Sequence, residues 1–147
     1  MVMDIPEFNT NMSVTVVMNG INENWQNSYF RLNGTSDTLI PSARKVQSNI
    51  LPQTLCATIL NNSEIVACGL CVIEHNYAGL YDIVVSPQHR QKGYGQDICI
   101  SLLSNAAKLG ATKAYLQVVA DNKKAINLYT KLGFKDSYEY WYRAKYL

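Results

Sequence analysis

The sequence predicts an α/β (α+β) fold, in which one mixed, mostly antiparallel sheet carries helices on both faces. Two patterns predict it. Apolar runs of strand length alternate with segments in which apolar residues recur at helical spacing, and turn-forming residues separate them. The predicted order is β-α-α-β-β-β-α-β-α-β, in which three strands in succession form an antiparallel meander. No linker divides the chain, so a single domain over residues 1–147 is expected.

The first third of the chain predicts one strand and two helices. Residues 1–12 are polar and are expected to be flexible. Trp25, Tyr29 and Leu32 recur at helical spacing, and this stripe could either line a substrate pocket or pack on the sheet. Pro41 suits the first turn of a second helix. The expected elements are a strand over 12–18, a helix over 22–34 and a helix over 41–51.

The remainder alternates strands with helices and ends in an aromatic tail. Asp121 or Asn122 suits the start of the last helix, and Gly133 followed by Phe134 suits its end. The expected elements are strands over 54–60, 65–74, 78–85 and 114–119, helices over 93–110 and 122–133, and one or two final strands within 134–143.

The connection between residues 82 and 95 predicts an anion site. A β-branched strand runs through a Pro-containing turn into the start of an amphipathic helix, whose first amides have no intrahelical acceptor. Gly93 and Gly95 lack a Cβ, so a phosphate can approach the backbone closely, and Arg90 and Lys92 add positive charge. A pyrophosphate cradle is therefore predicted. The alternative is a tight strand-to-helix connection that carries surface charges.

Two motifs taken together indicate a family. Val84-Val85-x-Pro87-x-x-Arg90-x-x-Gly93-x-Gly95 is followed by Asn122-x-x-Ala125-x-x-Leu128-Tyr129-x-x-Leu132-Gly133-Phe134. This pair resembles the GNAT superfamily of N-acetyltransferases over about residues 53–147. The resemblance implies acetyl-CoA as co-substrate and direct transfer of its acetyl group to a primary amine of a small molecule or peptide.

The resemblance also implies roles for individual residues. The sheet would splay between strands 78–85 and 114–119, and the pantetheine arm would pair there with the backbone of Ile83, Val84 and Val85. The backbone N–H of Val85, or of a neighbour, would polarise the thioester carbonyl. The pyrophosphate would be held by the cradle residues Arg90, Gln91, Lys92, Gly93, Tyr94, Gly95 and Gln96.

Two residues of the second motif have open alternatives. Asn122 would contact the cofactor, although it could equally serve only as a helix cap. Tyr129 would face the sulfur, either as general acid or as hydrogen-bond donor to the departing thiolate, and its alternative is a core aromatic.

The general base does not carry over from the family. Many relatives place a Glu six residues before the second Val of the cradle strand, where this chain has Gly79. Asp82, Glu74 and His75 are the catalytic candidates in its place, and His75 has the most suitable unperturbed pKa. A chain of water molecules could remove the proton instead.

Composition and spacing argue against other classes of function. The formal charge of +2 is too small for a nucleic-acid partner. Cys68-x-x-Cys71 lies in a predicted strand, where residues three apart point to opposite faces, so no metal site is expected. No apolar run reaches membrane-spanning length and no signal peptide is visible, so no membrane partner and a cytoplasmic location are expected.

Three functions remain open at this level. The first is a cytoplasmic N-acetyltransferase, and the second is an acyl-CoA-binding sensor without turnover, which the missing Glu favours. The third is a degenerate domain that binds another chain, and the retained motif residues argue against it. Aromatic residues crowd the last ten positions, which suggests a homodimer interface or, equally, an intramolecular sheet face; they are Tyr138, Tyr140, Trp141, Tyr142 and Tyr146.

Overall fold

The protein is described here from a computed structural model covering residues 1–8, 15–140, 143 and 145. The chain order is β1 (Val2–Asp4), β2 (Thr15–Asn19), α1 (Glu23–Asn33), α2 (Ile40–Ser48), β3 (Gln53–Asn61), β4 (Glu64–Glu74), β5 (Tyr77–Val85), the 3-10 turn η1 (Pro87–His89), α3 (Tyr94–Lys108), β6 (Lys113–Leu116) and α4 (Lys123–Leu132).

The strands form one six-stranded sheet in the spatial order β1-β6-β5-β4-β3-β2. β3, β4 and β5 form the predicted meander, and every neighbouring pair is antiparallel except β5 and β6. This parallel pair needs a crossover, which α3 supplies. The predicted mixed, mostly antiparallel sheet is confirmed.

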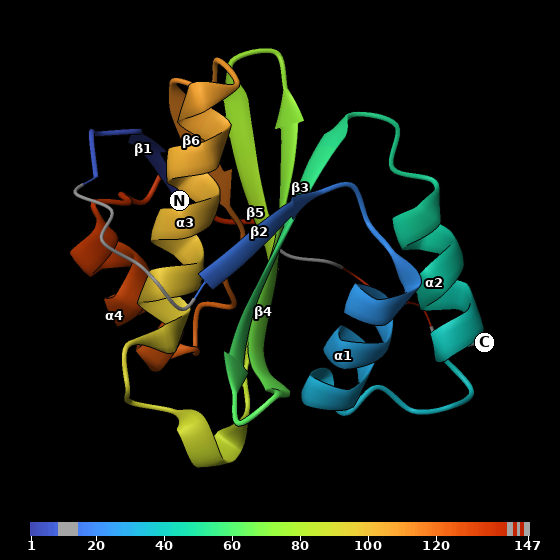
Figure 1. The fold of residues 1–147 in the computed structure, drawn as a ribbon. Coiled ribbons are helices and arrows are strands. Elements are labelled where there is room, and N and C mark those ends of the chain that lie inside the picture. The colour runs from blue at the N-terminus through green and yellow to red at the C-terminus, as the bar shows by residue number, and fades with distance from the viewer. Residues whose placement is uncertain (9–14, 141–142, 144, 146–147) are drawn as a thin grey trace.

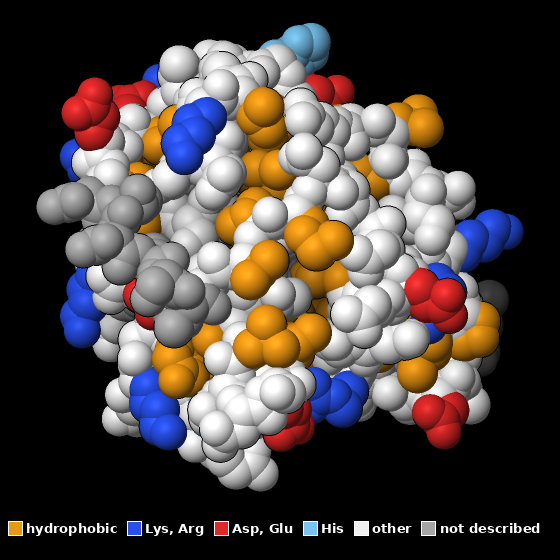
Figure 2. All heavy atoms as spheres, in the orientation of Figure 1, with side chains coloured by type: hydrophobic (Ala, Val, Ile, Leu, Met, Phe, Trp, Pro, Cys, Tyr) orange, Lys and Arg blue, Asp and Glu red, His pale blue; other side chains and the backbone are white. Residues whose placement is uncertain are grey.

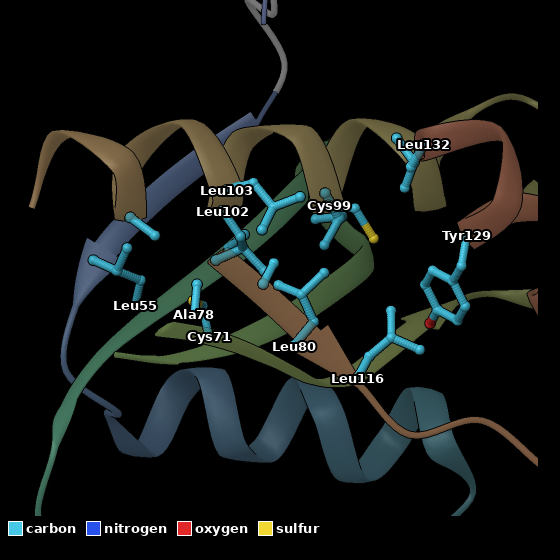
Figure 3. Packing of buried hydrophobic residues seen from close by; sticks show 14 of the residues in the cluster. Leu55, Cys71, Ala78, Leu80, Cys99, Leu102, Leu103, Leu116, Tyr129 and Leu132 are labelled. Atoms are coloured by element: carbon cyan, nitrogen blue, oxygen red, sulfur yellow. The ribbon is translucent and has the colours of Figure 1, made fainter. Parts of the chain in front are cut away.

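Helices cover both faces of the sheet, as predicted. α3 and α4 lie on one face, and α1 and α2 lie on the other (Figure 1). The core under α3 and α4 contains fully buried leucines such as Leu102 and Leu103, each of which stabilises the fold by about 1.5–3 kcal/mol (Figure 3). Trp25 and Leu70 belong to the smaller core under α1.

The two cysteines of the Cys-x-x-Cys spacing lie on opposite faces of β4. Cys71 belongs to the core under α3, whereas Cys68 packs in the core under α1. All four cysteines are buried free thiols. Their separation follows from the alternation of side chains along a strand and agrees with the argument against a shared metal.

The predicted ends of the first and last helices agree with the structure, whereas the end of the second helix does not. Asn22 caps α1, because its Oδ1 accepts a hydrogen bond from the Trp25 N–H at 2.8 Å. Gly133 ends α4 with φ 108°, and the Phe134 N–H donates to the Tyr129 carbonyl at 3.0 Å. α2 ends three residues before the predicted boundary at residue 51.

Both ends of the chain differ from the prediction. Part of the segment expected to be flexible forms β1, and Val2 pairs with Tyr115 of β6. The outer edge of β6 is therefore taken by β1 and is closed to the tail. Lys135 makes a single bridge to Val2, and residues 136–140 form no strand. Residues 9–12 and the tail positions Trp141, Tyr142 and Tyr146 lie outside the described residues.

Apolar side chains also reach the surface. They form a band down the middle of one face, over the strands between α3 and the α1–α2 pair (Figure 2). Val16 and Met18 of the outer strand β2 are among the exposed apolar residues. Among the described residues, no helix is both long and apolar enough to cross a bilayer.

Candidate active site

The sheet opens between β5 and β6. Their pairing ends at Leu80 and Leu116, although β5 continues to Val85. Asp82 has φ 55° and lies where the register of β5 against β4 shifts, so one extra residue of β5 bulges at this point. The bulge changes the direction of β5 just where the pairing of β5 with β6 ends. The splay between these two strands was predicted through the resemblance.

Backbone groups of β5 face this gap. The Ser86 N–H donates to the Val66 carbonyl of β4 at 2.7 Å, and N–H groups alternate sides along a strand. The Val85 N–H and carbonyl therefore point away from β4 and toward the gap. The Arg90 Nε donates to that carbonyl at 3.4 Å, while β6 provides no partner at this level. An extended ligand could pair with this edge as an added strand does.

A cavity of about 240 Å³ lies at the splay and brings two of the predicted catalytic residues together. Its lining comes from β5, α4 and the segment after β6. The lining residues are Leu80, Tyr81, Asp82, Ile83, Gln117 and Tyr129. Asp82 and Tyr129 are 47 residues apart in the sequence, so only the fold places them on the same cavity.

Tyr129 points from α4 toward Leu116, hydroxyl end first (Figure 3). Its ring packs edge-on against Phe134, with the centroids 5.9 Å apart. Burial, and then the nearby Cys99 thiol, raise the pKa of the phenol. Tyr129 therefore remains protonated over the physiological range and can donate a hydrogen bond into the cavity.

Asp82 is held from the α1–α2 face. Its Oδ2 accepts a hydrogen bond from the Gln47 Nε2 at 3.1 Å. Burial raises the pKa of Tyr29, and the negative charge and hydrogen bonding of Asp82 raise it further. The carboxylate therefore sits between a fixed amide donor and a protonated phenol.

The cradle has the local geometry of an anion site. Gly93 adopts φ 82° directly before α3, and Gln91 adopts φ 62°. The helix begins at Tyr94, so its first N–H groups lack intrahelical acceptors and the positive end of its dipole faces the loop. Arg90 and Lys92 are exposed beside it.

Gly95 is needed for a different reason from Gly93. A Cβ at position 95 would lie 3.3 Å from the Leu128 Cδ2 of α4 and 3.8 Å from the Val85 Cγ2. The missing side chain therefore lets the start of α3 approach both α4 and the end of β5. Asn122 caps α4, because its Oδ1 accepts a hydrogen bond from the Ala125 N–H at 3.2 Å, so its side chain already has a structural role.

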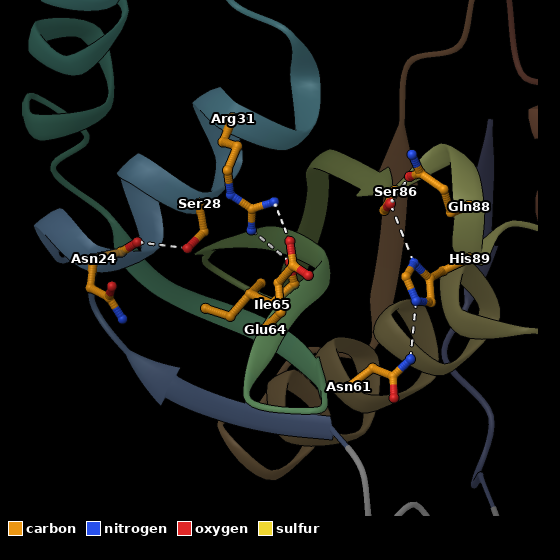
Figure 4. Close-up of polar contacts among 9 residues, drawn as sticks. All are labelled: Asn24, Ser28, Arg31, Asn61, Glu64, Ile65, Ser86, Gln88 and His89. Atoms are coloured by element: carbon orange, nitrogen blue, oxygen red, sulfur yellow. Dashed lines mark hydrogen bonds and ion pairs between the residues drawn. The ribbon is translucent and has the colours of Figure 1, made fainter.

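A hydrogen-bonded histidine fixes the turn that precedes the cradle. The His89 Nε2 lies 3.0 Å from the Asn61 Nδ2, and its Nδ1 lies 3.3 Å from the Ser86 Oγ (Figure 4). An amide nitrogen can only donate, so Nε2 accepts and the Nδ1–H donates to Ser86. The Ser86 hydroxyl in turn donates a hydrogen bond to the Gln88 Oε1 at 2.7 Å. Sequence analysis missed this arrangement.

Glu74 and His75 lie elsewhere. Both are exposed at the turn between β4 and β5, beside an open hollow of about 800 Å³ that residues 49–52 also line. Asp82 is five residues beyond the first residue of β5, which places it roughly 17 Å along the strand at about 3.3 Å per residue. The structure therefore does not bring Glu74 or His75 to the cavity that Asp82 and Tyr129 line.

Gly79 stands where many relatives have a Glu, and two tyrosine side chains occupy the space beside it. A Cβ at position 79 would lie 2.7 Å from the Tyr115 Cζ and Oη and 2.8 Å from the Tyr81 Cε2. The two hydroxyls are 2.9 Å apart and their rings meet edge-on. Sequence reasoning singled out neither tyrosine, nor Gln117. The absence of a side chain at Gly79, on a strand, was the one signal of a close approach by another group.

The sequence of this chain is similar to those of known N-acetyltransferases. The chain is 30% identical over 121 residues to the uncharacterized N-acetyltransferase YobR of Bacillus subtilis (strain 168), covering 82% of this chain and 49% of that protein. It is 28% identical over 96 residues to the [ribosomal protein bS18]-alanine N-acetyltransferase of Escherichia coli (strain K12), covering 65% of each. The chain thus spans about half to two thirds of these relatives' lengths.

Solved structures agree on the fold. AAC(6')-Iy, in complex with the bisubstrate analog CoA-S-monomethyl-acetylneamine, superposes with a TM-score of 0.70 at 13% identity, over 92% of this chain and 100% of that one. The family model described as "Acetyltransferase (GNAT) family" matches residues 21–134, which include the cradle, the bulge and the helix that carries Tyr129. The family and the fold predicted from the two motifs are confirmed: this chain belongs to the acetyltransferase (GNAT) family.

Proposed function

We propose that this protein transfers the acetyl group of acetyl-CoA to a primary amine of a small molecule or peptide. The observation that carries the proposal is the cavity at the splay, which Asp82 and Tyr129 both line. The relatives of this chain are named as N-acetyltransferases, and the similar structure of AAC(6')-Iy is a complex with a CoA-containing bisubstrate analog. The acetyl-CoA would lie along the gap-facing edge of β5, with its pyrophosphate in the cradle.

The chemistry needs a proton acceptor on one side of the acetyl group and a donor on the other. The amine nitrogen forms a C–N bond to the thioester carbon, the C–S bond breaks, and sulfur leaves with the electron pair. Asp82 takes the surplus proton of the nitrogen. The Val85 N–H polarises the carbonyl oxygen, and the Tyr129 hydroxyl donates a hydrogen bond to the departing sulfur.

The raised pKa of Tyr129 limits its role. Full transfer of its proton to a thiolate is already uphill by about 1.5 pKa units for unperturbed groups, and burial widens this gap. Tyr129 therefore acts as a hydrogen-bond donor that strengthens as charge develops on sulfur. Tyr129→Phe should lower kcat by about 10–10³-fold with little change in acetyl-CoA affinity, measured by steady-state kinetics and calorimetry. Full kcat in this variant would leave Tyr129 as a packing residue.

The test of the function is release of free thiol from acetyl-CoA with a panel of primary amines, with the acetylated product identified by mass. Thiol release that depends on one amine supports the transferase. Tight CoA binding without amine-dependent release would support the sensor alternative. The homodimer and the cytoplasmic location stay predictions. Light scattering that gives a monomer mass at high micromolar concentration would exclude the dimer.

A further inference from the structure

A chain of hydrogen-bonded polar side chains runs from α2 to α1, returns to α2 and ends on β5. The Arg44 Nη1 donates to the Gln26 Oε1 at 2.8 Å, and the Gln26 Nε2 donates to the Gln47 Oε1 at 3.2 Å. The Gln47 Nε2 then donates to the Asp82 Oδ2 at 3.1 Å. Gln26 and Gln47 are only 4% and 7% exposed. Buried amides of this kind are costly unless they are hydrogen-bonded, so their positions are strongly specified.

Arg44 sets the direction of every bond in this chain. A guanidinium has only donors, so the Gln26 amide must turn its oxygen toward Arg44 and its nitrogen toward Gln47. Gln47 must then present its own nitrogen to the carboxylate. Arg44 is itself fixed, because it lies 5.3 Å over the Phe30 ring and its Nη2 donates to the Asn27 Oδ1 at 2.7 Å.

The groups that face Asp82 from other elements are neutral. They are Tyr29 on α1, Cys56 on β3, Cys68 on β4 and Tyr129 on α4 across the cavity. Burial raises the pKa of each, and the charge of Asp82 contributes for the first three. Among the described residues of the hydrogen-bonded chain, Arg44 is the cation. It acts on Asp82 through the side-chain amides of Gln26 and Gln47.

We propose that Arg44, Gln26 and Gln47 are positioning residues for acetyl transfer, which hold the carboxylate of Asp82 in one orientation at the cavity. This rests on the proposed role of Asp82 as proton acceptor. The last donor of the chain, the Gln47 amide, occupies Oδ2 and so restrains the orientation of the carboxyl group. Side chains on two helices thereby control a proton acceptor on the sheet.

The test measures kcat and the acetyl-CoA KM with the amine that the panel identifies. Gln47→Leu should lower kcat by about 10–100-fold, and Arg44→Met by about 3–10-fold, with the acetyl-CoA KM unchanged. Arg44→Lys should recover most of the rate, since it restores a donor.

Matched variants distinguish a failure of the positioning proposal from a failure of the proposed role of Asp82. Arg31→Met removes an arginine of α1 whose partners, Glu64 and the Ile65 carbonyl, lie outside the hydrogen-bonded chain, and it should leave kcat within twofold of the parent. Gln26→Met breaks the chain in its middle and serves if Gln47→Leu fails to fold. If Asp82→Asn lowers kcat but the Gln47, Gln26 and Arg44 variants match the parent, the positioning proposal is wrong while the role of Asp82 stands. Full kcat in Asp82→Asn would overturn both.

Discussion

Gly79 can be tested as a position closed to any side chain. It lies on β5 with an ordinary strand backbone, so conformation alone does not require glycine there. Elsewhere, Gly→Ala at a compatible site stabilises a protein by about 0.4–1 kcal/mol. At position 79 the added Cβ would lie 2.7 Å from the Tyr115 ring, and overpacking of this kind costs about 1–3 kcal/mol. Gly79→Ala should therefore destabilise the protein by about 1–2 kcal/mol.

A double-mutant cycle isolates the cause. Urea unfolding would compare Gly79→Ala in the parent and in Tyr115→Ala, where the ring that lies closest is gone. The destabilisation should shrink or change sign in the second background, with a coupling of at least about 1 kcal/mol. A neutral or stabilising Gly79→Ala in the parent would refute the reasoning. Gly79→Glu should likewise be destabilising and should not raise acetyl transfer, because Tyr115 fills the place of the family's carboxylate.

The remaining predictions concern the cradle and the buried thiols. Gly95→Val should weaken CoA binding more than tenfold (about 1.4 kcal/mol) in calorimetry, and an unchanged affinity would contradict the cradle. Arg90→Ala should weaken CoA binding by an amount that shrinks as salt rises, whereas Lys108→Ala, at the other end of α3, should not. Burial raises the pKa of the cysteine thiols from 9.0 to about 12, so the folded state retains protons that the unfolded state loses. Stability should be full below about pH 9 and fall above it by about 1.4 kcal/mol per pH unit per thiol; urea unfolding under reducing conditions should show a shallower fall in Cys56→Ala.

Local signals in the sequence were enough for most elements and for the course of the loop that forms the predicted cradle. Helix ends such as Asn22 and Gly133 depend on contacts within a few residues, and the cradle is one continuous turn. β1 could not be predicted in this way, because Val2–Asp4 is too short to show alternation and forms a strand only against β6. The tail was misjudged over residues 136–140 for a different reason: its pattern predicted a strand, but β1 already occupies the outer edge of β6.

The cavity could be predicted only in part. Tyr129 and Asp82 were candidates, one from a motif and one from its place on the cradle strand, but their meeting depends on the bulge at Asp82. Gln26 and Gln47 look like ordinary surface residues of amphipathic helices. Their burial follows from the packing of α1 and α2 over the sheet, and their partners lie 21 and 35 residues away in the sequence. No local pattern encodes such pairs.

In the proposed mechanism the two sides of the cavity have different roles, and each side lies in a different kind of environment. Burial among apolar groups raises the pKa of Tyr129, which keeps its proton on the oxygen and makes it a donor. Asp82 receives donors through Gln47, in a direction that Arg44 fixes, which makes it an acceptor. Acyl transfer has the same asymmetry, since a proton leaves nitrogen while negative charge develops on sulfur. The polar chain from α2 and the apolar packing of α4 thus match the two sides of the proposed reaction, with a proton acceptor for nitrogen at Asp82 and a hydrogen-bond donor for sulfur at Tyr129.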